Sequence, residues 1–177
     1  MGATISGHHM KERFMDVYSA EDLLSRRLGD IHSSACFLAQ HIPFMVSAAE
    51  SDGLRKLLNL YLDVVRDNAD RTEEAMRVVA NQLSGRDPTA VPAMVDDLFD
   101  LIDRIDEPAL VDVAILLSSN EIGSFEAQRL QLLSNFAETL GRTDARNALR
   151  TSSECLASIC VQLNDMITEN GEDQRLQ

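Results

Sequence analysis

The sequence predicts an all-α protein, a four-helix bundle with a short extra helix in the long connection between its second and third helices. Apolar residues recur at steps of three and four along four long segments, as they do on one face of an α-helix. Aromatic residues make up only 5% of the chain and Trp is absent, whereas sheets favour aromatic and β-branched residues. With 177 residues, the chain is long enough for one domain with a buried core.

The first long helix is expected from Ser19 to Ala48. Ser19 and Asp22 resemble a capping pair, and Pro43 is expected to bend the helix or to interrupt it near its end. His32 and His41 lie beside the inner stripe, where a packed or surface histidine is more common than a metal ligand. The residues expected on the inner stripe are Leu24, Leu28, Ile31, Ala35, Leu38, Ile42 and Met45.

The second long helix is expected from about Leu54 to Leu83, after a break at residues 51–53. Charges of both signs crowd its later half, which is typical of a solvated helix face with ion pairs one turn apart. The residues expected on its inner face are Leu54, Leu58, Tyr61, Val65 and Asn68.

A short amphipathic helix ending near Arg104 is expected to span the connection, after a break at residues 84–88. Its apolar residues are Met94, Val95, Leu98, Leu101 and Ile102. Its four aspartates are expected to face solvent, because the segment lacks the alternating oxygen ligands and the central Gly of a calcium-binding loop.

The third long helix is expected from Ala109 to Gly141, with Pro108 at its start, and the last helix from Thr143. The third helix has a narrow inner stripe that carries neither carboxylate nor imidazole: Val113, Leu116, Asn120, Gly123, Ala127, Leu130, Ser134 and Ala137. It also has a second apolar face, made of Leu110, Leu117, Phe125, Leu132 and Phe136. We expect this second face to join the core; if it is exposed, it predicts a partner helix. The last helix has Ala145, Ala148, Ser152, Cys155, Ile159, Leu163 and Met166 on its inner face.

The bundle is expected to occupy residues 19–170, between a flexible extension at residues 1–18 and a polar tail at residues 171–177. The extension contains a His8-His9 pair that could bind a metal ion weakly, although a leader without a structural role is the favoured interpretation. Whether residues 1–9 are native is left open by the sequence.

A formal net charge of −13 argues against nucleic acid or an anionic membrane as the main partner. There is no long apolar stretch and no leader of the secretory type, so we expect a cytoplasmic protein. Cys36, Cys155 and Cys160 have no disulfide or zinc-finger spacing, and we expect them to be free thiols whose redox role is open. The chain contains no Gly-rich phosphate loop, no nucleophile elbow, no His-Glu-x-x-His and no CxxC motif.

Several short segments in a fixed order resemble one known family. They are the opening Ala20-Glu21-Asp22-Leu23-Leu24, the pair Ile42-Pro43, Met94-Val95-Asp96-Asp97 with Leu101-Ile102, Asp112-Val113-Ala114-Ile115 and the ending Phe136-Ala137-Glu138-Thr139-Leu140-Gly141. This set resembles the YciE/YciF-type ferritin-like proteins, a family of bacterial stress-associated four-helix bundles. The resemblance covers nearly everything from Ser19 to Asp165 and implies a ferritin-like fold.

The resemblance also implies a di-iron-type site of carboxylates and histidine on the inner helix faces, and this sequence has lost most of it. The positions that match the family's ligands are Ala35, Tyr61, Val64, Gly123, Ser124, Glu126 and Cys155. Tyr18-Ser19-Ala20-Glu21 spells the family's first-helix motif, but placing the ligand at Glu21 requires a gap, whereas Ala35 needs none. A di-metal site needs about four carboxylates and two imidazoles, so we expect neither metal nor another cofactor. Glu126 alone remains, and Tyr61 is a conceivable hydrogen-bond partner for it.

We therefore expect a non-catalytic member of the family, which acts through assembly as a homodimer or as a heterodimer with a related bundle protein. The core polar residues are then expected to form a hydrogen-bonded patch that fixes the helix register. The alternative is a di-iron or di-manganese protein, for iron handling or oxidase-type chemistry, with relocated ligands drawn from Glu21, Asp63, Asp67, Glu126 and Glu154. A bundle with a small-molecule cavity is a third possibility.

Overall fold

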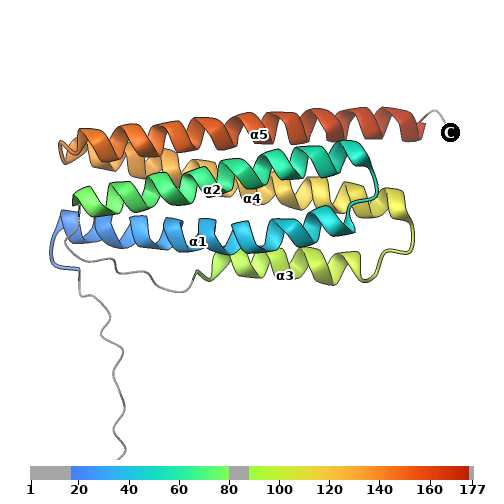
Figure 1. Ribbon diagram of the computed structural model, residues 1–177, viewed down its shortest axis with the longest axis horizontal. Coiled ribbons are helices and arrows are strands. Elements are labelled where there is room, and N and C mark those ends of the chain that lie inside the picture. Colours follow the sequence, from blue (N-terminus) through green and yellow to red (C-terminus); the bar gives the residue numbers. More distant parts are fainter. Residues whose placement is uncertain (1–16, 80–87, 176–177) are drawn as a thin grey trace, which may run out of the picture.

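The computed structural model describes residues 17–79 and 88–175, with side chains described as far as Thr168. It contains five helices, α1 (Ala20–Ala48), α2 (Asp52–Val79), α3 (Ala90–Ile102), α4 (Pro108–Thr139) and α5 (Thr143–Arg175) (Figure 1). The long helices α1, α2, α4 and α5 form the bundle, and the short α3 packs on α1 and α4. The predicted all-α architecture with one short helix in the middle connection is confirmed. The expected end of the second helix at Leu83 and most of the expected N-terminal extension lie outside the described residues.

The start of α1 and the end of α4 are each fixed by hydrogen bonds and backbone conformation within a few residues. Ser19 Oγ accepts the Asp22 N–H at 3.0 Å, and the Asp22 carboxylate accepts the Tyr18 N–H at 3.2 Å, which confirms the predicted capping pair. Gly141 has a φ of +69°, and the following Arg142 N–H donates to the Ala137 carbonyl at 2.9 Å, so α4 ends in the left-handed conformation that glycine adopts without strain. Pro43 does not interrupt α1, which continues to Ala48.

The inner stripes predicted for the first two helices are confirmed, because all twelve of those residues are buried. On α3, Val91, Val95 and Leu98 are buried, whereas Leu101 is exposed and does not join the core as expected. In Figure 1, α3 lies beside the C-terminal part of α1. The backbone of α5 is helical as far as Arg175, beyond the expected start of a polar tail at residue 171.

A buried carboxylate on α4 holds the turn between α1 and α2. Asp112 is only 7% exposed, and its two oxygens accept the backbone N–H groups of Glu50 at 2.7 Å and Ser51 at 2.9 Å. These two N–H groups are thereby satisfied, and α4 is fixed against the end of the α1–α2 pair. Within the described part of the chain, no helix is long and apolar enough to cross a membrane.

Candidate functional site

The middle of the bundle contains most of the positions that match the family's metal ligands. Ala35, Tyr61, Gly123 and Glu126 are buried there, and Val64 and Cys155 are partly buried. Ser124 is exposed, so its expected place on the inner stripe is wrong. Only one carboxylate is present among these inward positions, and it comes from α4.

Gly123 allows α5 to approach α4 closely. A Cβ atom at this position would lie 2.8 Å from Cys160 Sγ and 3.5 Å from Tyr61 Oη. Asn120 on the same helix donates from Nδ2 to the Cys160 carbonyl at 3.2 Å. The Cys160 thiol therefore fills the space that a longer side chain at residue 123 would need.

Tyr61 is completely buried, and its hydroxyl has no hydrogen-bond partner among the described residues. Burial raises the pKa of Tyr61, and the nearby Cys160 and Glu126 act in the same direction. The conceivable hydrogen bond between Tyr61 and Glu126 is not formed. The Ser152 hydroxyl is likewise buried without a partner in the described part of the chain, so the predicted hydrogen-bonded patch is confirmed only in part.

The partner of Glu126 is an arginine one turn along α4. Glu126 is 3% exposed, and its Oε1 accepts from Arg129 Nη1 at 2.5 Å, while the same guanidinium nitrogen donates to Ser34 Oγ at 3.2 Å. The Arg129 guanidinium also lies over the Phe125 ring, 5.3 Å from its centroid. Burial raises the pKa of Glu126, and the charges of Arg129 and Arg27 oppose that rise. This geometry pairs the carboxylate with a guanidinium, and in the part of the chain that the structure describes no further His, Cys, Asp or Glu side chains join it in a group that could hold a metal ion.

The other acids considered as relocated ligands do not converge on Glu126. Each is exposed and pairs with an arginine: Glu21 with Arg142, Asp63 with Arg66, Asp67 with Arg71 and Glu154 with Arg150. Among the residues that the structure describes, no group of three His, Cys, Asp or Glu side chains is placed to hold a metal ion.

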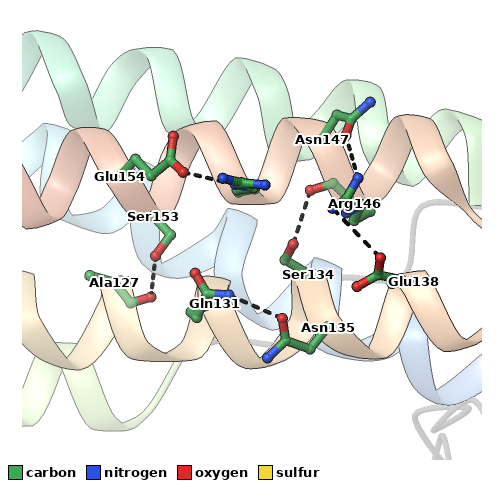
Figure 2. A network of polar contacts seen from close by, with 10 residues as sticks. Ala127, Gln131, Ser134, Asn135, Glu138, Arg146, Asn147, Ser153 and Glu154 are labelled. Atoms are coloured by element: carbon green, nitrogen blue, oxygen red, sulfur yellow. Dashed lines mark hydrogen bonds and ion pairs between the residues drawn. The ribbon is translucent and has the colours of Figure 1, made fainter.

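Polar contacts join α4 to α5 (Figure 2). Ser134 Oγ donates to the Arg146 carbonyl at 3.0 Å, and Ser153 Oγ donates to the Ala127 carbonyl at 2.9 Å. Because serine is small, each of these bonds lets the two helix backbones come close together. Sequence reasoning placed Ser134 on the inner stripe but missed Ser153, whose acceptor is a backbone carbonyl with no sequence signal.

The second apolar face of α4 is largely exposed, so the expectation that it joins the core is wrong for four of its five residues. Phe136 is partly buried, and the exposed fractions are 43% for Leu110, 47% for Leu117, 38% for Phe125 and 59% for Leu132. We call these four exposed residues the outer stripe of α4. Between Leu110 and Asn135, a stretch that is described in full, the single charged residue among the exposed ones is Glu121.

A cysteine and a histidine form a close pair on α1, beside α2. The Cys36 Sγ lies 3.5 Å from His32 Nε2, and His32 Nδ1 lies 3.1 Å from the Ala69 carbonyl oxygen. Because a carbonyl can only accept, Nδ1 carries the hydrogen and the lone pair of Nε2 faces the sulfur. Burial raises the pKa of the Cys36 thiol, and the negative charges of Glu73 and Asp70 raise it further.

Comparison with known proteins agrees with this architecture. The structure of YcfI from Rhodopseudomonas palustris matches with a TM-score of 0.81 at 23% identity, covering 85% of this chain and 96% of that chain. The E. coli stress protein YciF matches with a TM-score of 0.83 at 17% identity, covering 88% of this chain and 99% of that chain. No curated protein matches the chain.

At these identities the structural likeness shows the fold alone, a YciF-like ferritin-like bundle. A family model covers nearly all of the bundle, which confirms the resemblance found in the sequence. This model, described as a domain of unknown function (DUF892), matches residues 19–174, and the chain belongs to that family.

Proposed function

We propose that this protein is a non-catalytic, stress-associated bundle that acts by assembling with a second bundle through the outer stripe of α4. The observation that carries the proposal is the exposure of Leu110, Leu117, Phe125 and Leu132 along one helix. They follow one another at steps of seven and eight, so they form a line of about 33 Å along the helix surface. An exposed apolar line of this length is typical of a surface that another helix covers.

The charge of the protein favours this face over the others. Two copies of a chain with a net charge of −13 repel each other. The repulsion is smallest where the contact surface carries little negative charge. On α4, Glu121 is the single charged residue among the exposed ones between Leu110 and Asn135, and the exposed Arg27 of α1 adds a positive charge beside Phe125 and Leu132. A two-fold axis would bring this stripe against itself, because the same patch then serves both subunits. A related bundle with a similar stripe would form a heterodimer in the same way.

The side chains in the bundle interior support a non-catalytic role. A di-metal site needs several carboxylates, whereas among the described positions that match the family's ligands Glu126 is the single carboxylate, and it is already paired with Arg129. The association with stress rests on the description of YciF as a stress protein.

The direct test is the molar mass of the purified full-length protein, measured by light scattering after size-exclusion chromatography over a range of concentrations. The wild type should have the mass of two chains. Leu117→Glu should weaken the dimer about tenfold or more, because it buries a charge in the contact and α4 has no basic residue one turn away to pair with it. Val161→Glu is the matched control, since Val161 is 60% exposed on α5 and the substitution adds the same charge. That variant should remain a dimer.

The heterodimer is tested by mixing the protein with a related bundle protein and repeating the measurement. A chain that stays monomeric alone and in the mixture contradicts the proposal. Equal weakening by Leu117→Glu and Val161→Glu would also contradict it, because the effect would then come from the added charge and not from its position.

The loss of the di-metal site is tested separately. The protein is incubated with iron(II) and then with manganese(II), desalted, and its metal content is counted. We expect no retained pair of ions. Two ions per chain, lost in Glu126→Gln, would instead support the alternative of a di-iron or di-manganese protein.

A further inference from the structure

We infer that the surface between α1 and α4 holds a binding site for a small organic anion with an apolar chain. Two adjoining cavities form this site, one polar and one apolar, and both are lined by Arg27 and Arg129. The inference goes beyond the proposed assembly. The site shares Phe125 and Leu132 with the outer stripe of α4, but it does not require a dimer.

The polar cavity has a volume of about 240 Å³ and brings two guanidinium groups together with the start of a helix. Arg27 comes from α1 and Arg129 from α4, whereas Thr89 and Ala90 lie at the N-terminus of α3. The protein as a whole has a net charge of −13. A place where two cations meet the positive end of a helix dipole is therefore where this chain attracts an anion.

The two arginines have N–H groups left for a ligand. Arg27 donates to Asp30 through Nη1 at 3.3 Å, and Arg129 also donates through Nη1, to Glu126 and Ser34. Among the described residues the other nitrogens of these two guanidiniums have no hydrogen-bond partner. A carboxylate or a phosphate accepts such N–H groups in pairs. It can therefore bind without breaking either ion pair, and Asp30, which also lines the cavity, keeps its partner.

The start of α3 adds backbone donors to the same cavity. Thr89, the N-cap residue, makes no side-chain hydrogen bond to the helix, and the first turn contains no acidic residue. The N–H groups of Ala90 and Val91 have no acceptor among the described residues. An anion in the cavity lies beside this N-terminus, where free N–H groups and the helix dipole favour negative charge.

The apolar cavity has a volume of about 230 Å³ and continues along α1 and α4 from the two arginines. Its residues on α4 extend as far as Phe136, seven positions beyond Arg129. This distance is about 10 Å along the helix, the length of a chain of roughly eight carbon atoms. The apolar residues that line the cavity are Leu23, Ile31, Leu132, Leu133 and Phe136.

The two cavities together select the class of ligand. Pockets for drug-sized molecules have about 300–1,000 Å³, so each cavity alone fits only a small group. An inorganic anion would leave the apolar cavity unused, and a neutral apolar molecule would leave the N–H groups of the arginines unpaired. A carboxylate or a phosphate on a short apolar chain uses both cavities, with its charged end at Arg27 and Arg129.

The experiment is a calorimetric titration of the full-length protein with octanoate and, separately, with octyl phosphate. We expect saturable binding of one molecule per chain, and the tighter of the two identifies the preferred charged group. Octanol has the chain without the charge, and acetate has the charge without the chain. Each should bind at least about tenfold more weakly than octanoate.

Substitution of an arginine tests the charged end of the site. Arg27→Gln should weaken octanoate binding about tenfold, because a charged donor is lost at the surface of the cavity. Arg55→Gln is the matched control. Arg55 pairs with an aspartate three residues away, as Arg27 does, and lines neither cavity. The control removes the same charge and should leave the binding unchanged.

Substitution of a leucine tests the apolar end. Leu132→Ala should weaken octanoate binding about threefold, because the alkyl chain loses part of its apolar contact, and it should leave acetate binding unchanged. Leu110→Ala is the control, since Leu110 is an exposed leucine of the same helix that lines neither cavity. Circular dichroism of each variant separates loss of binding from loss of the fold.

Three results would overturn the inference: no saturable binding of either acid, equal binding of octanol and octanoate, or equal weakening by Arg27→Gln and Arg55→Gln. The test is independent of the proposed assembly. Leu117 lines neither cavity, so Leu117→Glu should bind octanoate at least as tightly as the wild type, whether or not it weakens a dimer. A monomeric protein that binds octanoate would contradict the assembly alone, and a dimer that does not bind it would contradict the site alone.

Discussion

The two buried carboxylates of α4 are in contrasting surroundings. Near the start of the helix, Asp112 accepts two backbone N–H groups at 2.7 and 2.9 Å. In the middle, Glu126 pairs with Arg129 at 2.5 Å, in a region where the hydroxyls of Tyr61 and Ser152 have no partner among the described residues. At the end of the bundle, Asp112 thus fixes the backbone of the α1–α2 turn. In the middle, the charge of Glu126 is neutralised by that of Arg129.

This difference concerns the positions that the sequence resemblance matched to metal ligands. A carboxylate that held an ion there would need a second acid beside it, and Glu126 has a guanidinium instead. Among the described residues, the polar groups in the middle either pair with a guanidinium or have no partner, and the substitutions below measure what each group contributes to stability.

The largest effect is expected from Arg129→Met. This change leaves Glu126 buried without its partner, and breaking a buried pair in this way costs about 3–5 kcal/mol of the free energy of unfolding. The loss should be smaller under weakly acidic conditions. Burial raises the folded-state pKa of Glu126, so the protonated side chain is tolerated at low pH and the penalty grows as the pH rises through that pKa.

Urea unfolding followed by circular dichroism, at weakly acidic and at weakly alkaline pH, measures both effects. The double variant Glu126→Gln and Arg129→Met should recover most of the loss, because no buried charge then remains. An Arg129→Met variant that loses equal stability at both pH values would show that Arg129 acts through packing on Phe125 and not through its charge.

At the end of the bundle, Asp112→Ala should cost about 2–3 kcal/mol, because two backbone N–H groups lose a charged acceptor. Asp112→Asn keeps one acceptor oxygen and should cost about half as much. Thermal unfolding of the three proteins gives the order, and an alanine variant as stable as the wild type would mean that water replaces the carboxylate.

The helices differ in how well the sequence predicts which of their faces are buried. The inner stripes of α1 and α2 could be predicted because leucine and isoleucine recur there with the helical period. On α4 the predicted inner stripe is also buried at six of its eight positions. The helix packs against α1, α3 and α5 and is apolar on more than one side, so its period left open whether the second apolar face is buried, and the outer stripe was assigned to the core.

The prediction of the site residues was partly wrong for a related reason. Ser124 and Glu126 are two positions apart, which is more than half a helical turn, so an uncertain register exchanges an exposed residue for a buried one. The partnership of Glu126 with Arg129 has a sequence signal in its spacing of three, but spacing does not show that a pair is buried. The contact of Cys160 with Gly123 joins two helices and has no local signal at all.

In the middle of the bundle, Gly123→Ala should cost about 1–3 kcal/mol, because the new Cβ would lie 2.8 Å from Cys160 Sγ. Adding Cys160→Ala should restore part of this loss, and the double variant should be more stable than the sum of the two single changes predicts. Gly53→Ala is the control. Its Cβ would meet Met166 Cε at an ordinary 3.7 Å, so that variant should be as stable as the wild type or slightly more stable.

The smallest effect is expected from Tyr61→Phe, and its sign is informative. The Tyr61 hydroxyl is buried without a hydrogen-bond partner among the described residues, so its removal should leave the stability unchanged or raise it by up to about 1 kcal/mol. Asp112→Ala is the opposite case, because both carboxylate oxygens that it removes accept a hydrogen bond. A Tyr61→Phe variant that loses more than about 1 kcal/mol would show that the hydroxyl has a partner in solution. Glu126 or a bound ion would then be the first candidates for that partner.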